Sequence, residues 1–250
     1  MTTATETFAS FDGTELAVRR LGQGRPVVLL HGLFSDAETN WIRFGHAQRL
    51  ADAGFEAIMP DLRAHGKSGK PHDPEAYPHD VLVRDARALV AHLALEDYDL
   101  AGFSLGARTA VRCVLDGLAP RRLVLAGMGL EGLAGWNRRA AFFIDAIDRF
   151  DEVRQGDPAF MAVSFMKTQK VDRIAARLLL QAVEDTGEDE LARVTMPTLV
   201  VCGDKDRDNG SPQALAEALP EGAFAEIPGT HMSSVTGPEL GEAIARFLTA

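Results

Sequence analysis

The amino-acid sequence predicts a single α/β domain built on a mostly parallel sheet of about eight strands. Short apolar runs alternate with amphipathic helical stretches along most of the 250 residues, and repeated strand-then-helix units imply a twisted parallel sheet with helices on both faces. The run Pro26-Val27-Val28-Leu29-Leu30 is continuously apolar, as expected of a strand that is buried on both faces. A chain of this length can bury one sizeable core.

An antiparallel hairpin precedes the parallel part of the predicted sheet. The residues on both sides of Asp12-Gly13 alternate between apolar and polar, and this dipeptide favours a tight turn. The expected strands span residues 7–11, 15–20, 26–30, 55–59, 97–101, 122–126, 197–202 and 223–227. The helices expected between and after them span residues 41–53, 80–95, 106–115, 212–219 and 238–248.

The pattern changes to helices alone between residues 132 and 194, with candidates at 137–150, 158–166 and 171–183. We interpret this segment as a helical cap inserted between two strands, so that residues 1–131 and 195–250 form the core and residues 132–194 form the cap. Ligands of such sheets bind outside the carboxyl ends of the strands. The insertion leaves from that edge, and the cap should therefore cover the site.

Composition excludes several classes of function. The formal net charge of −10 argues against a nucleic-acid partner, because phosphate binding needs a clustered basic surface. The first ten residues lack the basic and apolar regions of a secretory signal, and no stretch approaches the roughly 20 apolar residues of a membrane span. We therefore expect a cytoplasmic protein. Cys113 and Cys202 provide neither a disulfide framework nor the spacing of metal ligands, and both are expected to be buried.

The motif with the clearest chemical meaning is Gly102-Phe103-Ser104-Leu105-Gly106, at the junction of a strand and a helix. The pattern G-x-S-x-G places a serine on a strained turn where bulky neighbours would clash, and it exposes the hydroxyl at the end of the sheet. A serine hydroxyl is a weak nucleophile at neutral pH and needs a neighbouring base. Ser104 is the candidate nucleophile.

His231 is the candidate base, because it follows the last expected strand in a loop that contains Pro228 and Gly229. Such a loop can bring an imidazole within hydrogen-bonding distance of a distant serine. The competing histidines are His31, His46, His65, His72, His79 and His92. We expect surface positions for His46, His79 and His92, which lie in or near helices. Structural hydrogen bonds suit the two loop residues His31 and His65 better.

A carboxylate should orient the imidazole and stabilise its cationic form. The loop after the strand at residues 197–202 offers Asp204, Asp206 and Asp208. We select Asp206, with Asp204 as the next choice, and Glu131 is a more distant alternative. The remaining carboxylates of the loop are then ordinary solvated groups.

Acyl transfer also needs donors for the oxyanion that forms when the serine attacks. The backbone N–H of Leu105, directly after the serine, is the first candidate. The second is the N–H of Leu33 in His31-Gly32-Leu33-Phe34, which follows the third strand. The side chains expected to line the substrate pocket are Phe34, Phe103, Trp136, Phe143, Met161 and Phe165. Arginines that could pair with a substrate carboxylate, or form surface salt bridges instead, are Arg63, Arg108 and Arg138.

The order serine, aspartate, histidine matches the order of the α/β-hydrolase superfamily, and the chain resembles that superfamily over nearly its whole length. The resemblance is carried by His31-Gly32, by residues 61–68, by the serine motif, by Gly203-Asp204-Lys205-Asp206 and by Gly229-Thr230-His231. It implies an α/β-hydrolase fold, and the last position of the G-x-x-D pattern, Asp206, as the catalytic acid. Leu33 and Phe34 replace two glycines that follow the histidine in many lipases.

Within the superfamily, the sequence is similar to small carboxylesterases, lactonases and carbon–carbon bond hydrolases with a helical cap. Dehalogenases and epoxide hydrolases carry an aspartate where this chain has Ser104, whereas cofactor-free haloperoxidases also use serine. The resemblance implies a hydrolase of a small-molecule carboxylic ester or lactone that acts through an acyl-enzyme on Ser104, without metal or cofactor. The alternatives are carbon–carbon bond hydrolysis or acyl transfer with the same triad, and a small-ligand receptor on a hydrolase scaffold.

Overall fold

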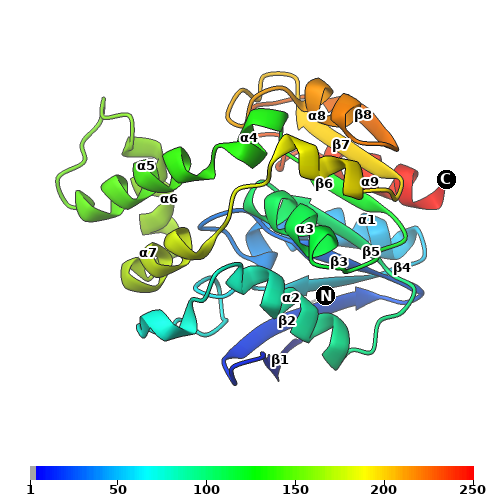
Figure 1. Ribbon diagram of the computed structural model, residues 1–250, viewed down its shortest axis with the longest axis horizontal. Coiled ribbons are helices and arrows are strands. Elements are labelled where there is room, and N and C mark those ends of the chain that lie inside the picture. The colour runs from blue at the N-terminus through cyan, green and yellow to red at the C-terminus, as the bar shows by residue number, and fades with distance from the viewer. Residues whose placement is uncertain (1–3) are drawn as a thin grey trace.

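The computed structural model describes residues 4–250 and contains an eight-stranded sheet with the order β1-β2-β4-β3-β5-β6-β7-β8. Strand β2 runs antiparallel to both β1 and β4, and the pairs from β4 to β8 are parallel. The predicted fold class, a mostly parallel sheet behind an antiparallel hairpin, is confirmed. Figure 1 shows the helices on both faces of the sheet.

Most elements lie within a few residues of their expected positions. The strands are β1 (Thr5–Ala9), β2 (Glu15–Gly22), β3 (Arg25–Leu30), β4 (Phe55–Pro60), β5 (Asp99–Phe103), β6 (Leu123–Ala126), β7 (Thr198–Gly203) and β8 (Gly222–Ile227). The α-helices are α1 (His46–Asp52), α2 (Val81–His92), α3 (Leu105–Leu115), α4 (Leu130–Ala134), α5 (Trp136–Asp148), α6 (Phe160–Gln169), α7 (Arg173–Ala182), α8 (Pro212–Ala218) and α9 (Glu239–Thr249). The short helical turns are η1 (Glu38–Ile42), η2 (Pro74–Ala76) and η3 (Glu188–Arg193).

Two hydrophobic cores form on opposite faces of the sheet. In β3, Val28 and Leu30 contribute to the core under α2 and α3, whereas Val27 and Leu29 contribute to the core under α1 and α9. This follows from the alternation of side chains along a strand. It also explains why the parallel strands read as continuously apolar runs, since both faces are covered.

The expected helix over residues 41–53 is interrupted. A π-helical turn, η1, ends at Ile42, and α1 begins only at His46, after Gly45 adopts a left-handed conformation with a φ of 76°. The break turns His46 inward, where the residue is 0% exposed and its Nε2–H donates a 2.7 Å hydrogen bond to the backbone oxygen of Val235. The expected surface position of His46 is therefore wrong, because a glycine break rather than a continuous helical period sets its direction.

The segment between β6 and β7 contains α4, α5, α6, α7 and η3, and in Figure 1 α5, α6 and α7 form a group beyond one end of the sheet. The three expected helices are present, together with the short helix α4, which the sequence analysis did not predict. Among residues 4–250, every helix is too short or too polar to span a lipid bilayer.

Arg108 ties both ends of this helical segment to α3. Its guanidinium donates hydrogen bonds to the backbone oxygens of Gly132, Leu133 and Glu184, and it lies 4.9 Å from the ring centroid of Trp136. Burial lowers the pKa of Arg108 to about 10. Arg108 is thus neither a surface salt bridge nor a free partner for a substrate carboxylate, because backbone oxygens occupy its donors.

Arg63 also has a structural role, between the β1–β2 turn and α2. Its guanidinium is fully buried and pairs with Asp85 and Asp12, each through two hydrogen bonds. Hydrogen bonding to Arg63 lowers the pKa of Asp12 to about 2, whereas burial raises the pKa of Asp85. The network joins the β1–β2 turn to α2. Neither expected use of Arg63 is found, and Arg138 lies exposed on α5.

Replacing Arg63 by Met should destabilise the protein by about 3–5 kcal/mol, because Asp85 would remain buried without its partner. Arg87→Met is the matched control. Arg87 of α2 pairs at the surface with Asp116, which follows α3, and its loss should cost less than about 1 kcal/mol. Urea unfolding at pH 7 measures both free energies. Equal losses in the two variants would contradict a structural role for the buried pair.

Candidate active site

Ser104, His231 and Asp206 meet at the carboxyl ends of three parallel strands. Ser104 directly follows β5, Asp206 follows β7, and His231 follows β8. The Oγ atom of Ser104 lies 3.0 Å from Nε2 of His231, and Nδ1 of His231 lies 2.8 Å from Oδ2 of Asp206. Asp206 is 2% exposed and His231 is 9% exposed, whereas Ser104 is half-buried. The structure therefore brings the three sequence-selected residues into one hydrogen-bonded chain with the serine at its accessible end.

The conformation of Ser104 is strained. Its φ of 53° and ψ of −111° lie outside the regions that L-residues usually occupy, which costs of the order of 1–3 kcal/mol. Two glycines make the turn possible. A Cβ on Gly102 would lie 2.1 Å from the backbone oxygen of Gly106, and a Cβ on Gly106 would lie 2.0 Å from the backbone oxygen of Leu30. The G-x-S-x-G pattern thus reflects backbone contacts that leave no space for a side chain.

The carboxylate of Asp206 is fully hydrogen-bonded. Oδ2 accepts from Nδ1–H of His231 and, at 3.4 Å, from the thiol of Cys202, while Oδ1 accepts from the N–H of Asp208. Burial alone would raise the pKa of Asp206, but the hydrogen bond and charge of His231 outweigh this effect and the pKa falls below its usual value. Asp206 therefore stays ionised beside the imidazole. Both Cys202 and Cys113 are buried, as expected.

The two alternative acids have other partners. Oδ1 of Asp204 accepts from the N–H of Gly229 at 2.7 Å, which joins the loop after β7 to the loop that carries His231. The carboxylate of Glu131 accepts from the N–H of Ser211 at 2.7 Å. Asp204 therefore supports the loop that carries His231 and is not an ordinary solvated group. Its effect on His231 passes through that loop.

The backbone donors on both sides of Leu33 are occupied. The N–H of Gly32 donates to Oδ1 of Asn40, that of Phe34 to Nε2 of His65, and that of Ser35 to the oxygen of Gly32. Within residues 4–250, the N–H of Leu33 has no acceptor. Leu105 begins α3, where the first N–H groups of a helix are unpaired and the helix dipole favours negative charge.

His31 and His65 hold this loop in place. Nε2 of His31 accepts from the N–H of Leu62, and Nε2 of His65 accepts from the N–H of Phe34, both at 2.9 Å. Their Nδ1–H groups donate to the backbone oxygens of Gly32 and Arg63. Burial lowers the pKa of both rings, that of His65 to about 3. Both histidines are therefore neutral and structural, in agreement with the sequence-based expectation.

Four of the expected pocket residues pack against the imidazole, the loop after β3 or the hydrophobic core. The ring of Phe103 lies 5.0 Å from the ring of His231, and Phe34 packs edge-to-face on Phe143 of α5 at 5.4 Å. The Phe34–Phe143 contact joins the loop after β3 to the inserted helices. Phe165 is half-buried against the same hydrophobic core. An aromatic ring therefore packs beside the imidazole of the hydrogen-bonded chain.

Two expected pocket residues have different positions. Met161 is 73% exposed on α6, so it points to solvent and does not line a pocket. Trp136 is buried, and its Nε1–H donates to the backbone oxygen of Leu180. Trp136 thus joins α5 to α7 and stacks on Arg108. Helical periodicity identifies residues on a common face, but it does not tell whether that face is turned to the core, the pocket or solvent.

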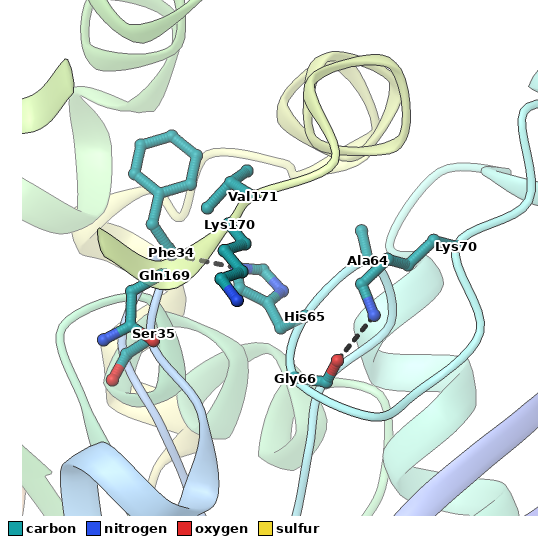
Figure 2. A pocket seen from close by; sticks show the side chains of 9 residues that line it. All are labelled: Phe34, Ser35, Ala64, His65, Gly66, Lys70, Gln169, Lys170 and Val171. Atoms are coloured by element: carbon teal, nitrogen blue, oxygen red, sulfur yellow. Dashed lines mark hydrogen bonds between the residues drawn. The ribbon is translucent and has the colours of Figure 1, made fainter. Parts of the chain in front are cut away.

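A cavity of about 240 Å³ lies beside the loop after β3 (Figure 2). It is bounded by residues from the loops after β3 and β4 and from the end of α6: Phe34, Ser35, Ala64, His65, Gly66, Lys70, Gln169, Lys170 and Val171. Phe34 is the only one of them that the sequence analysis assigned to a pocket. The others become neighbours only when the end of α6 packs across the loops that follow β3 and β4.

Asp206, Asp208 and His231 offer ligand atoms within 4.8 Å of one another. In this arrangement, however, Nδ1 of His231 is engaged with Asp206 and Nε2 with Ser104. Both ring nitrogens are therefore committed to the hydrogen-bonded chain. A metal bound through His231 would have to displace one of those hydrogen bonds.

Residues 27–242 match the model of the alpha/beta hydrolase family. The chain belongs to this family. A protein of Bacillus subtilis (strain 168), named AB hydrolase superfamily protein YisY, is 29% identical over 215 residues, which cover 77% of this chain and 78% of that protein. The non-heme haloperoxidase of Rhodococcus erythropolis is 28% identical over 229 residues, which cover 78% of this chain and 80% of that protein.

Among solved structures, the enol-lactonase from Burkholderia xenovorans LB400 superposes on this alpha/beta hydrolase with a TM-score of 0.77, at 21% identity over 98% of this chain and 100% of that one. At this identity the likeness supports the fold alone. The family membership and the eight-stranded sheet agree with the resemblance that the sequence motifs indicate.

Gly102→Ala should destabilise this alpha/beta hydrolase by at least about 3 kcal/mol, because the new Cβ would meet backbone atoms that cannot move independently. Gly117→Ala is the control: Gly117 has a φ of 101°, but a Cβ there has no atom within 4 Å. It should cost only the conformational strain, about 1–2 kcal/mol. Thermal and urea unfolding compare the two variants, and a smaller loss for Gly102→Ala would contradict the steric argument.

Stability should fall as the pH drops below 6.5. Between pH 6.5, the ordinary pKa of histidine, and pH 3, the unfolded chain binds a proton at His65 that the folded chain does not. The free energy of unfolding therefore decreases with falling pH, and His65→Gln should lose about 2 kcal/mol less than the wild type between pH 6.5 and 5. His92→Gln, at an exposed position, is the control. Identical pH dependence in His65→Gln and wild type would show that this histidine is not buried neutral.

Proposed function

We propose that this alpha/beta hydrolase cleaves a carboxylic ester or lactone through an acyl-enzyme on Ser104. The observation that carries the proposal is the chain of hydrogen bonds from Ser104 Oγ through the His231 ring to Asp206, at 3.0 and 2.8 Å. In it, the weak nucleophile has a base within reach, and that base has an ionised orienting group. The ring of Phe103 lies 5.0 Å from the imidazole.

In the proposed acylation step, His231 Nε2 accepts the proton of the Ser104 hydroxyl while Oγ forms a bond to the carbonyl carbon. The carbonyl oxygen becomes an oxyanion and accepts hydrogen bonds from the N–H groups of Leu33 and Leu105. The tetrahedral intermediate then collapses, the bond to the alcohol oxygen breaks, and His231 returns the proton to the leaving alcohol. Asp206 holds the ring and stabilises its cationic form throughout.

In the proposed deacylation step, His231 takes a proton from a water molecule, whose oxygen attacks the acyl carbon. The bond to Ser104 Oγ breaks, the serine recovers its proton from His231, and the acid leaves. The free N–H of Leu33 supports its role as an oxyanion donor, because the neighbouring donors of its loop are all occupied. Each such donor contributes roughly 2.7–4 kcal/mol of barrier lowering in enzymes where it has been removed.

Residues 132–194 are proposed to act as the cap of the site. The contact of Phe143 with Phe34 supports this assignment, because it joins α5 to the loop that carries the proposed oxyanion donor. Phe34, Phe103 and Phe143 make the covered space apolar around the reacting carbonyl. An ester with a hydrophobic portion of moderate size suits such a site. The name enol-lactonase of one structural neighbour agrees with a lactone as substrate.

Acyl transfer and carbon–carbon bond hydrolysis use the same triad, and the family likeness alone does not separate them from ester hydrolysis. The relative named as a non-heme haloperoxidase adds a further chemistry within this family. Product analysis decides among them. Ester hydrolysis gives the free acid in water and in the presence of added alcohol, whereas a transferase gives a new ester with the added alcohol.

Asp206→Asn should reduce kcat on a p-nitrophenyl ester about a thousandfold or more, because the imidazole would lose its orienting charge. Ser104→Ala should reduce it at least as much. Glu131→Gln is the matched control, since its carboxylate contacts Ser211 and not His231; its activity should stay within about twofold of wild type, which is under 0.5 kcal/mol. A p-nitrophenyl series from acetate to decanoate measures the rates. Ester hydrolysis that persists in folded Ser104→Ala would refute the proposed nucleophile.

A further inference from the structure

The cavity beside the loop after β3 has a distinctive charge. Its nine lining residues include two lysines, Lys70 and Lys170, and no carboxylate, in a chain whose formal net charge is −10. The one other titratable side chain in its wall, His65, is neutral because burial lowers its pKa to about 3. The wall is therefore cationic at neutral pH, in contrast to the protein as a whole.

Lys70 is held at the cavity by its own loop. Its Nζ donates to the backbone oxygens of Gly66 and Ser68, at 2.6 and 3.0 Å, and Figure 2 shows the bond to Gly66. An ammonium group has three N–H donors, so one remains. Burial lowers the pKa of Lys70, as expected of an ammonium that is partly removed from water.

Two carboxylates, those of Asp61 and Asp172, interact electrostatically with Lys70, but both are bound to other groups. Asp61 is buried and accepts from Arg19 and from the N–H groups of Ala37 and Lys67. Asp172 pairs with His72 and caps α7. These two acids offset the charge of Lys70 at a distance, but neither lines the cavity. The third donor of Lys70 thus has no carboxylate of this chain in the cavity wall.

Two further polar groups face the same space. Ser35 is 8% exposed, and its hydroxyl has no hydrogen-bond partner in residues 4–250 although it borders the cavity. The amide of Gln169 makes only a 3.3 Å contact with Thr39. Both side chains therefore offer polar groups to a molecule that enters the cavity.

Lys170 occupies a position where a lysine is unfavourable. It ends α6 in the left-handed conformation, with a φ of 51°, and glycine or asparagine usually takes this place. A glycine would remove the strain but also the ammonium group. The side chain is drawn at the cavity in Figure 2.

The cavity adjoins the proposed reaction centre through one residue. Phe34, whose ring borders the cavity, directly follows Leu33, the proposed oxyanion donor, and its N–H is held by His65 of the cavity wall. The volume of about 240 Å³ lies below the range of roughly 300–1,000 Å³ for sites that enclose a whole drug-sized ligand. It suits one end of a substrate.

We propose that this cavity binds a carboxylate of the substrate, so that the enzyme prefers esters or lactones that carry a second, ionised acid group. Lys70 and Lys170 supply the charge, and Ser35 and Gln169 supply hydrogen bonds. This inference rests on the proposed ester hydrolysis for the statement that the bound carboxylate belongs to a substrate. The binding of a carboxylate in the cavity does not depend on that activity. It replaces the arginines that the sequence suggested for this role, since Arg63 and Arg108 are both engaged elsewhere.

The test compares monoethyl esters of glutaric, adipic and suberic acid with neutral ethyl esters of the same chain length. The readout is the ratio of kcat/KM for the anionic ester to kcat/KM for the neutral one. Wild type should favour one anionic ester about tenfold or more, and Lys70→Met should lower that ratio about tenfold, as expected for the loss of a charge-assisted hydrogen bond. The optimal diacid length gives the separation between the cavity and Ser104.

Two further variants separate recognition from folding. Lys167→Met removes a lysine from the same helix, whose ammonium lies over the ring of Phe150 and outside the cavity, and the ratio should not change. Lys170→Gly relieves the strained backbone, so its melting temperature should equal or exceed that of wild type while the ratio falls. A preference that is absent in wild type, or that is unchanged in both Lys70→Met and Lys170→Gly, would overturn the proposal.

Calorimetric titration of Ser104→Ala with adipate distinguishes the two levels of the proposal. Binding that is weakened in Ser104→Ala/Lys70→Met supports the carboxylate site even if no ester is hydrolysed, in which case the proposed function fails alone. Ser104-dependent hydrolysis of neutral esters without adipate binding means that the carboxylate site fails alone. Adipate should also inhibit neutral-ester hydrolysis competitively; binding without competition would place the anion outside the substrate path and refute the proposal.

Discussion

The close contact between β3, β5 and α3 is the constraint on which the rest of the site depends. Gly102 and Gly106 face each other and the backbone of Leu30 with no space for a Cβ, so the helix begins directly at the sheet edge. Ser104 is thereby held at a φ of 53° with its side chain at the end of the strand. A serine in an ordinary turn would have alternative directions, whereas here the surrounding backbone permits only one.

The other groups reach Ser104 because parallel strands end at a common edge. The loops after β7 and β8 deliver Asp206 and His231, and Asp204 joins these loops through its bond to Gly229. On the opposite side, the neutral rings of His31 and His65 fix the loop that leaves the Leu33 N–H unpaired. The site is thus built from loops that buried polar contacts hold rigid, which gives the preorganisation that electrostatic catalysis requires.

The inserted helices contact the rest of the fold near this site in two ways. Arg108 binds the backbone at both ends of the insertion, so the segment leaves and returns over the helix that begins at Ser104. Phe143 packs on Phe34, and residues 169–171 close the cationic cavity on its other side. Apolar surroundings at the serine and a pair of lysines nearby give the proposed substrate two unlike ends, one hydrophobic and one ionised.

The sequence by itself determined the fold class and the three groups of the triad. Glycine spacing, apolar strands and Gly–Pro loops can be recognised locally in the sequence. Because the parallel strands end at one edge of the sheet, the residues that follow them lie together at that edge. Only the tertiary structure decided the directions of His46, Trp136 and Met161, the burial of Arg63 and Arg108, and the cavity around Lys70. Those features depend on which elements pack against one another. Helical periodicity and local sequence do not identify the element that covers a given face.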